Sequence, residues 1–377
     1  MNPALPPILE GAALSKHFAG RRRLFGSPSV VRAVDDVSLR VERGETLALV
    51  GESGSGKSTL GRLLLDLIAP TAGDVLYEGR NIASLPRAEA RTLRRDLGIV
   101  FQDPFASLNP RMSVADIVGE PIWLHEGLTR PDRKAKAAEL LRTVGLQAEH
   151  GTRFPHEFSG GQRQRIGIAR ALASSPKLLL GDEPVSALDV SVQAQIVNLL
   201  EDLKSQFGLT LVVVAHGLAV IRHMSDRVAV MYLGQIVELA PVDALFEEPL
   251  HPYSQALLSS VPVPSPRGRR ERAPIEGDIP SATRPPPGCR FHTRCPHVRP
   301  LCREARPPLE AGPGGRSVAC HFWREIAGAG AGTIVTPPAS AAFTRRLALF
   351  EARSQQTAAP AARAPDAAKA PAGANIT

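Results

Sequence analysis

The chain has 377 residues, of which 43% are apolar, 22% charged and 5% aromatic, and its formal net charge is +8. That length holds one large core with appendages, and the apolar share is typical of a globular protein. No run of eighteen apolar residues occurs and the N-terminus lacks the basic-then-apolar order of a signal peptide. We therefore expect no transmembrane span and a chain that stays in the cytosol.

Basic residues cluster at 21–23 and 267–272. Such clusters can attract anionic lipid or nucleic acid, but solvated loops are the favoured explanation. The few aromatic residues offer no platform on which nucleic-acid bases could stack.

The first fifty residues predict an antiparallel sheet that leads into a buried strand. Apolar and polar residues alternate over residues 8–50, most clearly at Val37–Val41, which is the period of a half-buried strand. Residues 43–45 predict a turn. The apolar run Thr46–Val50 that follows predicts a strand buried on both faces.

A glycine-rich stretch follows that strand and precedes a predicted helix at 58–65. It matches G-x4-G-K-S/T, in which the glycines let backbone N–H groups surround phosphates and the helix N-terminus adds a positive dipole. Lys57 is expected to pair with the β and γ phosphates of a nucleotide, and the Ser58 hydroxyl to bind Mg²⁺. The predicted nucleotide-binding residues here are Gly51, Glu52, Ser53, Gly54, Ser55, Gly56, Lys57, Ser58 and Thr59.

Helical periodicity predominates from about 115 to 175, is clearest at 135–144, and predicts a helical subdomain. Near its end, Ser159 predicts the cap of a helix that starts with two glycines. Those glycines leave backbone N–H groups free to bind an anion. One γ-phosphate needs only one phosphate-binding loop, so a second anion site is expected to serve a nucleotide held by a neighbouring subunit. An ordinary glycine N-cap is the alternative. The expected buried side of this helix is Ile166, Ile168, Ala169 and Leu172.

The apolar run that starts at Lys177 ends in Asp182 and Glu183, as expected of a parallel strand that delivers acids to the edge of a sheet. Asp182 is expected to hold Mg²⁺ through its waters, and Glu183 to polarise the water that attacks the γ-phosphate. Further on, Val228–Tyr232 and Gln235–Leu239 predict a hairpin that closes the domain.

In this order, the phosphate loop, the stretch Ser159-Gly160-Gly161-Gln162 and the acidic strand end resemble an ABC-transporter ATPase subunit, with Phe158 in place of the usual leucine. The resemblance implies an α/β P-loop NTPase fold of ABC type, with a RecA-like core, an antiparallel β subdomain and a helical signature subdomain. It also implies that Ser159, Gly160, Gly161 and Gln162 bind the ATP of a partner subunit.

Four more positions match the family. The resemblance implies that Gln102 senses Mg²⁺ and touches a membrane subunit, that Asp189 belongs to the loop crossing to the partner ATPase, and that His216 contacts the γ-phosphate. Phe18 is expected to stack on adenine, with Phe25 as a rival. Gly217 stands where the family commonly has Asp, which leaves the orientation of His216 open.

Residues 101–112 and 251–258 resemble the oligopeptide/dipeptide importer branch, and 102–105 with 181–184 its second, F-type ATPase. The resemblance covers about residues 8–323. It implies an ATP-hydrolysing subunit that energises solute import at the cytoplasmic face of the membrane. The implied partners are a second ATPase (a D-type paralogue or a second copy), two permease subunits and, indirectly, an extracytoplasmic solute-binding protein. The alternative is a soluble ABC ATPase acting on nucleic acid or ribosomes, which usually has two cassettes or a long coiled coil.

The composition changes after about residue 256, where a proline-rich stretch at 261–266 predicts a linker. All four cysteines follow it, spaced by 5, 6 and 17 residues, and such clustering in a cytosolic chain indicates metal rather than disulfides. In the peptide-importer branch a matching extension is associated with an iron–sulfur cluster, so Cys289, Cys295, Cys302 and Cys320 are expected to hold 4Fe-4S. Structural zinc, with help from His292, His297 or His321, and free thiols are the alternatives.

Three parts are therefore expected. Residues 1–255 form the nucleotide-binding domain, residues 256–325 the cysteine-bearing extension, and residues 326–377 an Ala/Pro-rich tail. That tail buries too little surface to offset its ordering entropy and is expected to be disordered.

Overall fold

The structure is a computed structural model that describes residues 6–20, 29–215, 217–259 and 277–328. They belong to one compact unit, Met1–Pro264 with Gly268–Ile334, and the second unit, Ser265–Arg267 with Val335–Thr377, lies outside the described residues. The predictions for Phe25, His216, both basic clusters and residues 329–377 of the tail also lie outside them. No helix in the described part is long and apolar enough to span a bilayer.

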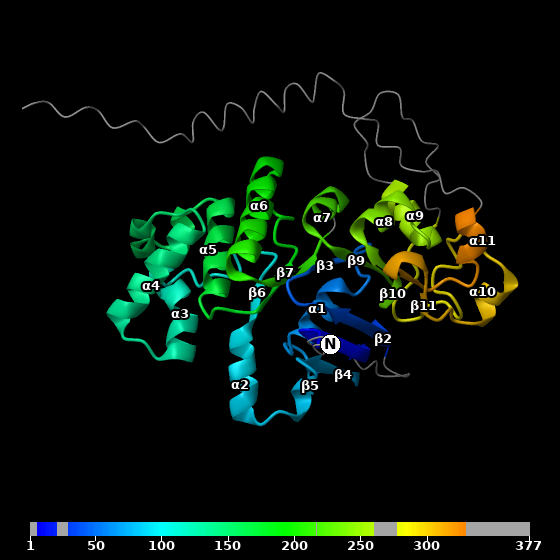
Figure 1. The fold of residues 1–377 in the computed structure, drawn as a ribbon, viewed down its shortest axis with the longest axis horizontal. Coiled ribbons are helices and arrows are strands. Elements are labelled where there is room, and N and C mark those ends of the chain that lie inside the picture. The colour runs from blue at the N-terminus through cyan, green and yellow to red at the C-terminus, as the bar shows by residue number, and fades with distance from the viewer. Residues whose placement is uncertain (1–5, 21–28, 216, 260–276, 329–377) are drawn as a thin grey trace, which may run out of the picture. The chain divides into compact units, whose positions relative to one another are not determined.

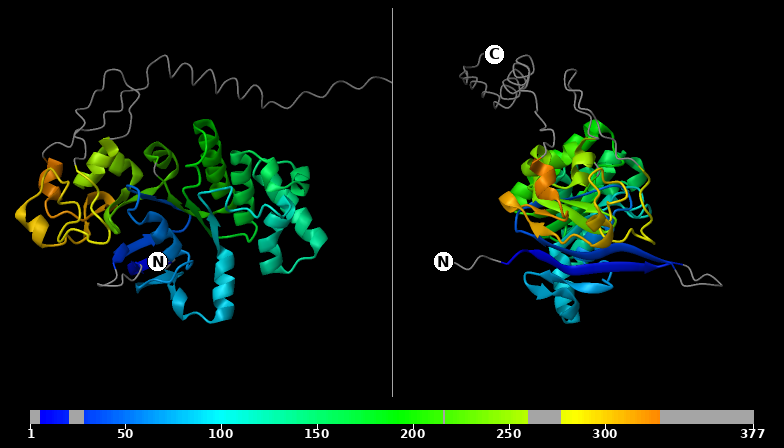
Figure 2. Two further views of the ribbon diagram at one scale, coloured as in Figure 1. Left: turned by 180° about the vertical axis from the view of Figure 1, so that it is seen from behind. Right: turned by 90° about the vertical axis from the view of Figure 1, so that its right-hand side faces the viewer.

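The first of two sheets is antiparallel, and its strands lie in the order β2 (Val30–Val41), β1 (Leu9–Ala19), β4 (Ala72–Tyr77) and β5 (Arg80–Asn81). Its long strands β1 and β2 run side by side in the right-hand view of Figure 2. Along β2, Val37, Leu39 and Val41 are buried while Ser38 and Arg40 are exposed. The predicted alternation is therefore real, and the antiparallel subdomain is confirmed.

The second sheet has eight strands, which lie in the order β11 (Glu310–Ala311), β12 (Ser317–Val318), β10 (Gln235–Pro241), β9 (Arg227–Tyr232), β3 (Thr46–Val50), β8 (Thr210–Val214), β7 (Leu178–Asp182) and β6 (Leu97–Val100). Figure 1 labels all of these strands except β8 and β12. Five neighbouring strands of this sheet, from β9 through β3, β8 and β7 to β6, are parallel to one another. In this register Val214 is paired with both Asp182 and Leu49. The carboxyl ends of β3, β7 and β8 therefore lie at one edge, so the residues that follow these strands meet there.

The hairpin β9–β10 forms as predicted around Gly234, whose φ is 81°. It does not close the sheet, because β12 pairs with β10, with Val318 opposite Glu238, and β11 pairs with β12. An unpaired outer strand offers a row of free backbone groups. Here residues beyond 309 satisfy those of β10, so the C-terminal extension continues the central sheet.

The helices α3, α4 and α5 pack on one another and form the predicted helical subdomain. The apolar side predicted for α5 is buried in the main core. Helix α1 begins at Lys57, one residue before the prediction, because Gly56 adopts the left-handed conformation at its N-cap.

The strands are β1 (Leu9–Ala19), β2 (Val30–Val41), β3 (Thr46–Val50), β4 (Ala72–Tyr77), β5 (Arg80–Asn81), β6 (Leu97–Val100), β7 (Leu178–Asp182), β8 (Thr210–Val214), β9 (Arg227–Tyr232), β10 (Gln235–Pro241), β11 (Glu310–Ala311) and β12 (Ser317–Val318). The α-helices are α1 (Lys57–Leu64), α2 (Arg87–Asp96), α3 (Val114–Glu126), α4 (Arg130–Thr143), α5 (Gly160–Leu172), α6 (Val190–Phe207), α7 (Leu218–Met224), α8 (Val242–Glu247), α9 (Pro252–Ser259), α10 (Pro300–Glu304) and α11 (Trp323–Gly328). Short 3-10 turns are η1 (Ile82–Ser84), η2 (Ala148–Thr152), η3 (Pro155–Glu157) and η4 (Pro313–Gly315).

Candidate functional site

The phosphate loop is the turn between β3 and α1, and its backbone requires glycine at two positions. At Gly51 φ is 146°, and at Gly56 it is 103°. A Cβ at Gly51 would lie 2.1 Å from the carbonyl oxygen of Met231, and one at Gly56 would lie 2.1 Å from that of Ala33. The loop therefore passes so close to neighbouring backbone that only glycine fits at either place.

Lys57 is buried inside this loop, where its ammonium group donates to the carbonyl oxygens of Gly51 at 2.8 Å and Glu52 at 3.0 Å. Burial lowers the pKa of Lys57, although the carboxylates of Glu183, Asp182 and Glu52 act in the opposite direction. The cation thus lies among polar partners that a phosphate group can replace.

Two buried oxygen atoms at this place have no hydrogen-bond partner among the described residues, Oγ of Ser55 and Oδ1 of Asp182. The other carboxylate oxygen of Asp182 accepts from Arg62 of α1 at 3.2 Å. Buried polar atoms are rarely left unpaired. A free carboxylate oxygen close enough to act on the pKa of Lys57 fits a magnesium ion or its water.

Glu183 follows β7 in a backbone conformation that is unusual for a residue with a side chain, with φ at 52°. Its N–H donates to the Val214 carbonyl at 3.0 Å, which ties it to the end of β8. Its carboxylate accepts from the Gln102 amide at 2.7 Å, which ties it to the residues after β6. Three neighbouring strand ends therefore position this one carboxylate, and two predicted site residues, Gln102 and Glu183, are in direct contact.

The start of α5 is a capping box. The Ser159 hydroxyl accepts from the Gln162 N–H at 3.3 Å, and the Gln162 amide oxygen accepts from the Ser159 N–H at 3.0 Å. A Cβ at Gly161 would lie 2.5 Å from the Val192 side chain of α6, whereas one at Gly160 would meet only Leu188 at 3.5 Å. Packing against α6 therefore explains Gly161, and a role of these residues toward a partner's nucleotide stays a prediction.

The remaining predicted positions lie apart from this cluster. Asp189 is the exposed N-cap of α6 and makes no side-chain cap bond. Phe18 lies on β1 with 42% of its surface exposed, and the Lys16 ammonium group lies 5.3 Å from its ring centre. Gly217 is the N-cap of α7.

Two contacts to the phosphate loop come from beyond residue 250 and were not predicted. Arg294 makes two hydrogen bonds to the Glu52 carboxylate, at 2.8 and 3.1 Å, and this pairing raises the pKa of Arg294. The Tyr253 hydroxyl accepts from the Glu52 N–H at 2.9 Å. Tyr253 could have been noticed because it lies in the branch-like stretch 251–258. Arg294 stands 242 residues from its partner and carries no sequence signal.

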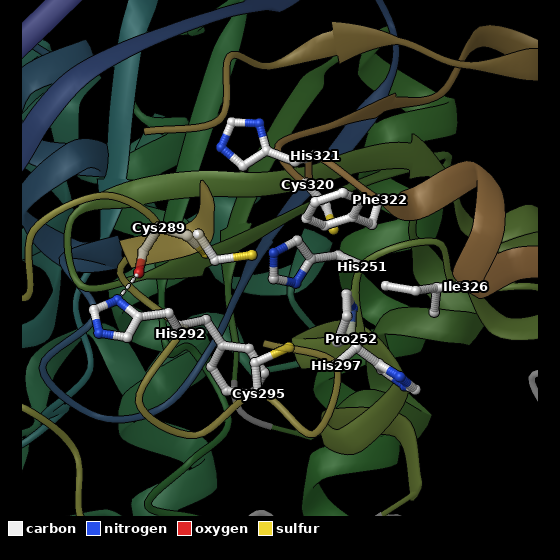
Figure 3. Close-up of a pocket in the computed structure, with 12 residues that line it drawn as sticks. His251, Pro252, Cys289, His292, Cys295, His297, Cys320, His321, Phe322 and Ile326 are labelled. Atoms are coloured by element: carbon white, nitrogen blue, oxygen red, sulfur yellow. Dashed lines mark hydrogen bonds between the residues drawn. The ribbon is translucent and has the colours of Figure 1, made fainter. Parts of the chain in front are cut away.

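All four cysteines line one pocket of the extension, and in Figure 3 the sulfurs of Cys289 and Cys295 point toward its middle. The cysteines are free, and burial raises the pKa of the Cys289, Cys295 and Cys320 thiols to about 11. Within the described ranges, however, no three His, Cys, Asp or Glu side chains are grouped closely enough to hold a metal ion. The side-chain positions therefore support neither the cluster nor the zinc alternative. The three histidines expected to help bind zinc, His292, His297 and His321, line the same pocket.

A mainly parallel sheet that carries a phosphate loop and two buried acids at one edge, with a separate helical subdomain, defines the ATP-binding cassette ATPases as the class of this protein. Solved structures agree. A post-hydrolysis dimer of the ATP-binding cassette MJ0796 with ADP and Pi is 30% identical, with a TM-score of 0.55, over 62% of this chain and 98% of that one. The cbiO1 subunit from Clostridium perfringens is 26% identical, with a TM-score of 0.54, over 64% and 91%.

Two family models match the sequence. Residues 34–186 match "ABC transporter", and residues 237–302 match "Oligopeptide/dipeptide transporter, C-terminal region". A probable peptide ABC transporter ATP-binding protein of Sinorhizobium fredii is 54% identical over 83% of this chain and 89% of its own length. The oligopeptide transport ATP-binding protein AppF of Bacillus subtilis is 51% identical over 84% of this chain and 97% of its own length. The oligopeptide transport ATP-binding protein OppF of Salmonella typhimurium is 49% identical over 80% of this chain and 92% of its own length.

The chain belongs to the ABC transporter ATP-binding proteins, in the branch with the oligopeptide/dipeptide transporter C-terminal region. The predicted family, fold class and ATPase activity are confirmed, and ATP is its nucleotide. The alternative of an ATPase acting on nucleic acid or ribosomes gains no support from these relatives.

Proposed function

We propose that this ATPase powers the import of oligopeptides, dipeptides or similar solutes. The support is the transport function in the names of relatives 49–54% identical to it, together with the match of residues 237–302 to the C-terminal region. The particular solute is selected elsewhere in such importers, by the membrane subunits and the solute-binding protein.

The roles of the site residues follow from their contacts. Lys57 exchanges its two carbonyl partners for the β and γ phosphates. Ser58 and the unpaired oxygen of Asp182 would hold Mg²⁺, directly or through water, and the ion would supply charge neutralisation at the phosphate oxygens. Glu183 would orient and polarise the attacking water. His216 lies outside the described residues, and its proposed contact with the γ-phosphate rests on the family resemblance alone.

The observation that carries this proposal is the position of Glu183. Its strained φ of 52° costs on the order of 1–3 kcal/mol, which persists only when the surroundings dictate it. Gln102 holds the carboxylate at 2.7 Å from the end of the adjacent strand. A movement of the Gln102 loop would therefore change the position of the proposed catalytic carboxylate.

Glu183→Gln tests the role directly. The amide keeps the shape but cannot polarise water, so hydrolysis should fall by about 100-fold or more while ATP binding persists. Turnover is measured by phosphate release and binding by equilibrium titration with ATP. Glu201→Gln, at a partly exposed carboxylate on α6, is the control and should leave turnover unchanged. Near-normal hydrolysis by Glu183→Gln would refute the assignment.

Ser159, Gly160, Gly161, Gln162 and Asp189 are proposed to face the ATP held by a second ATPase subunit, either a D-type paralogue or a second copy. Ser159 and Asp189 are exposed at the N-caps of α5 and α6, and the other three residues are half-buried, which supports this. Ser159→Arg should abolish cooperative hydrolysis in the assembled transporter while this chain still binds ATP. Gln206→Arg, at the exposed far end of α6, is the control. Unimpaired transport by the Ser159→Arg variant would refute the proposed role of Ser159 toward the partner subunit's ATP.

The loop after β6 is the proposed contact with two permease subunits at the cytoplasmic face of the membrane, which in turn receive solute from an extracytoplasmic binding protein. Phe101 and Phe105 flank Gln102 and are 38% and 61% exposed. Exposed aromatic side chains beside the proposed catalytic glutamine are suited to bury against a partner. This surface would join subunit movement to hydrolysis.

We also propose that the four cysteines hold a 4Fe-4S cluster, with zinc as the alternative. The motivation is the family resemblance and the lining of one pocket by all four cysteines, although their described side-chain positions do not form a metal site. A single zinc ion binds each thiolate sulfur at about 2.3 Å and so gathers its ligands more closely than a 4Fe-4S cluster, in which each cysteine binds a different iron atom. Iron and sulfide analysis of anaerobically purified protein tests this, and stoichiometric zinc would exclude it.

The boundaries 1–255, 256–325 and 326–377 likewise remain a proposal. The first falls inside α9, and α11 runs three residues past the second. Limited proteolysis of the full chain tests them, with cleavage expected near both.

A further inference from the structure

The cysteine-bearing extension reaches the phosphate loop through one buried side chain. Arg294, next in sequence to Cys295, is only 6% exposed and makes a two-bond ion pair with Glu52. Its guanidinium also donates to the Tyr232 hydroxyl at 3.3 Å. A bidentate Arg–carboxylate pair fixes both orientation and charge, which a single contact does not.

Glu52 is held a second time through its backbone. The Tyr253 hydroxyl accepts from its N–H, and the Tyr253 ring packs against Tyr232 and Phe291, with ring centres 4.7 and 5.4 Å away. Phe291 belongs to the extension, between Cys289 and Cys295. The same small cluster of aromatic side chains therefore supports both contacts to the loop.

The charge of Glu52 matters because of where it lies. Its carbonyl oxygen is 3.0 Å from the Lys57 ammonium group, and its carboxylate is one of three that act on Lys57. Asp182 and Glu183 are expected to face magnesium and water, but Glu52 has no such partner. An unpaired carboxylate at the phosphate loop would repel the phosphates of ATP. Arg294 cancels that charge and keeps the carboxylate turned toward the extension.

We propose that Arg294 is a positioning residue of the ATP site, which neutralises Glu52 and holds it away from the phosphates, so that the extension is a working part of that site. The proposal rests on the proposed function in one respect, that this loop binds ATP. It assigns to the extension a task that is independent of any group bound by the cysteines.

Four full-length variants test the charge balance, with ATP affinity measured by equilibrium titration before any hydrolysis assay. Arg294→Met should weaken ATP binding about tenfold, raising KM while kcat falls by less than about twofold, because the lost interaction acts before the chemical step. Arg294→Lys keeps the charge, so it should weaken ATP binding by less than half as much as Arg294→Met does, when both losses of affinity are expressed as logarithms. Glu52→Gln should tighten ATP binding, since the Arg294 cation is then left facing the loop.

The double variant Glu52→Gln/Arg294→Met distinguishes neutralisation of the Glu52 charge from a purely structural role of the ion pair. Removing both charges should restore affinity to within about threefold of the wild type, which is the coupling that a double-mutant cycle measures. Arg306→Met is the matched control. It removes another arginine that joins the extension to the ATPase domain, through Asp36 at 3.3 Å, without touching the loop, and should leave affinity unchanged.

Each outcome bears on the proposal. A double variant as weak as Arg294→Met, or an Arg294→Met protein that binds ATP normally, would overturn it while the proposed function stands. A wild-type protein without ATP affinity would instead overturn the proposed function. If Arg294→Met does not fold, as judged by circular dichroism, the Glu52→Gln variant carries the test alone, and unchanged or weakened binding there would overturn the proposal.

Discussion

Individual residues at the ATP site are held by neighbours from several strands, and Glu183 is the clearest case. Its positive φ, its N–H bond to Val214 and its contact with Gln102 come from three different parts of the chain. The type and place of this residue could be predicted from the acidic end of an apolar run. Its strain could not, because a backbone conformation of this kind is imposed by packing from neighbouring strands rather than by local propensity.

At the same scale, His251 gives the folded state a pH dependence. It is fully buried, its Nδ1 accepts from the Tyr253 N–H at 3.0 Å, and burial lowers its pKa from 6.5 to about 3. The unfolded chain therefore binds a proton between about pH 6.5 and 3 that the folded chain does not accept. Stability should fall as the pH drops through that window.

His251→Asn keeps an acceptor for the Tyr253 N–H and removes the titration. Across pH 6.5 to 4.5 its free energy of unfolding should depend less steeply on pH than that of the wild type, by up to about 1.4 kcal/mol per pH unit. Urea unfolding at several pH values measures this slope. Identical slopes for His251→Asn and the wild type would contradict the prediction.

At the scale of elements, the phosphate loop joins a strand and a helix whose positions leave little room. The strand, the loop and the helix were all predicted from local pattern, and β3 matches its predicted range. The partners that make two of the glycines necessary, the carbonyls of Met231 and Ala33, come from β9 and β2. Sequence motifs mark where glycine occurs, and the neighbouring backbone determines which glycine is indispensable.

Alanine substitutions should therefore separate the three glycines. Gly51→Ala and Gly56→Ala each bring a Cβ within 2.1 Å of a backbone carbonyl and should abolish ATP binding and lower the melting temperature. Gly54→Ala meets no atom within 4 Å and should cost only the strain of its positive φ, about 1–2 kcal/mol. Thermal unfolding and ATP titration measure both effects. A Gly54→Ala protein as damaged as the other two would contradict this ranking.

At the scale of the described unit, the extension completes the nucleotide-binding domain in two ways. Its β12 and β11 continue the central sheet beyond β10, and its arginines reach the surroundings of the phosphate loop. Arg290, next to Cys289, donates to the Leu233 carbonyl and the Asp35 carboxylate. The residue after Leu233, Gly234, donates its N–H to the Ser55 carbonyl of the phosphate loop at 2.8 Å. The proline-rich linker suggested an appendage, but the contacts make the extension part of the core.

Shortening the chain tests this dependence. A chain that ends at residue 259 leaves the outer edge of β10 without its partner strand, and exposed strand edges promote association. It should aggregate and bind ATP weakly, as seen by light scattering and ATP titration. A chain that ends at residue 328 keeps every described contact and should behave as the full-length protein does. A monodisperse 1–259 chain with normal ATP affinity would show that the extension is dispensable.

The sequence by itself determined the family, the phosphate loop, the acidic strand end and the capped signature helix, because each is a short pattern in which neighbouring residues define the local structure. The tertiary structure alone decided the strain at Glu183, the sheet that continues through β12, and the pairing of Arg294 with Glu52. These depend on residues brought together from distant parts of the chain, and no local period or spacing records such a meeting. Both partners of the ion pair are plain charged residues in the sequence, and only the fold brings them into contact beside the phosphate loop.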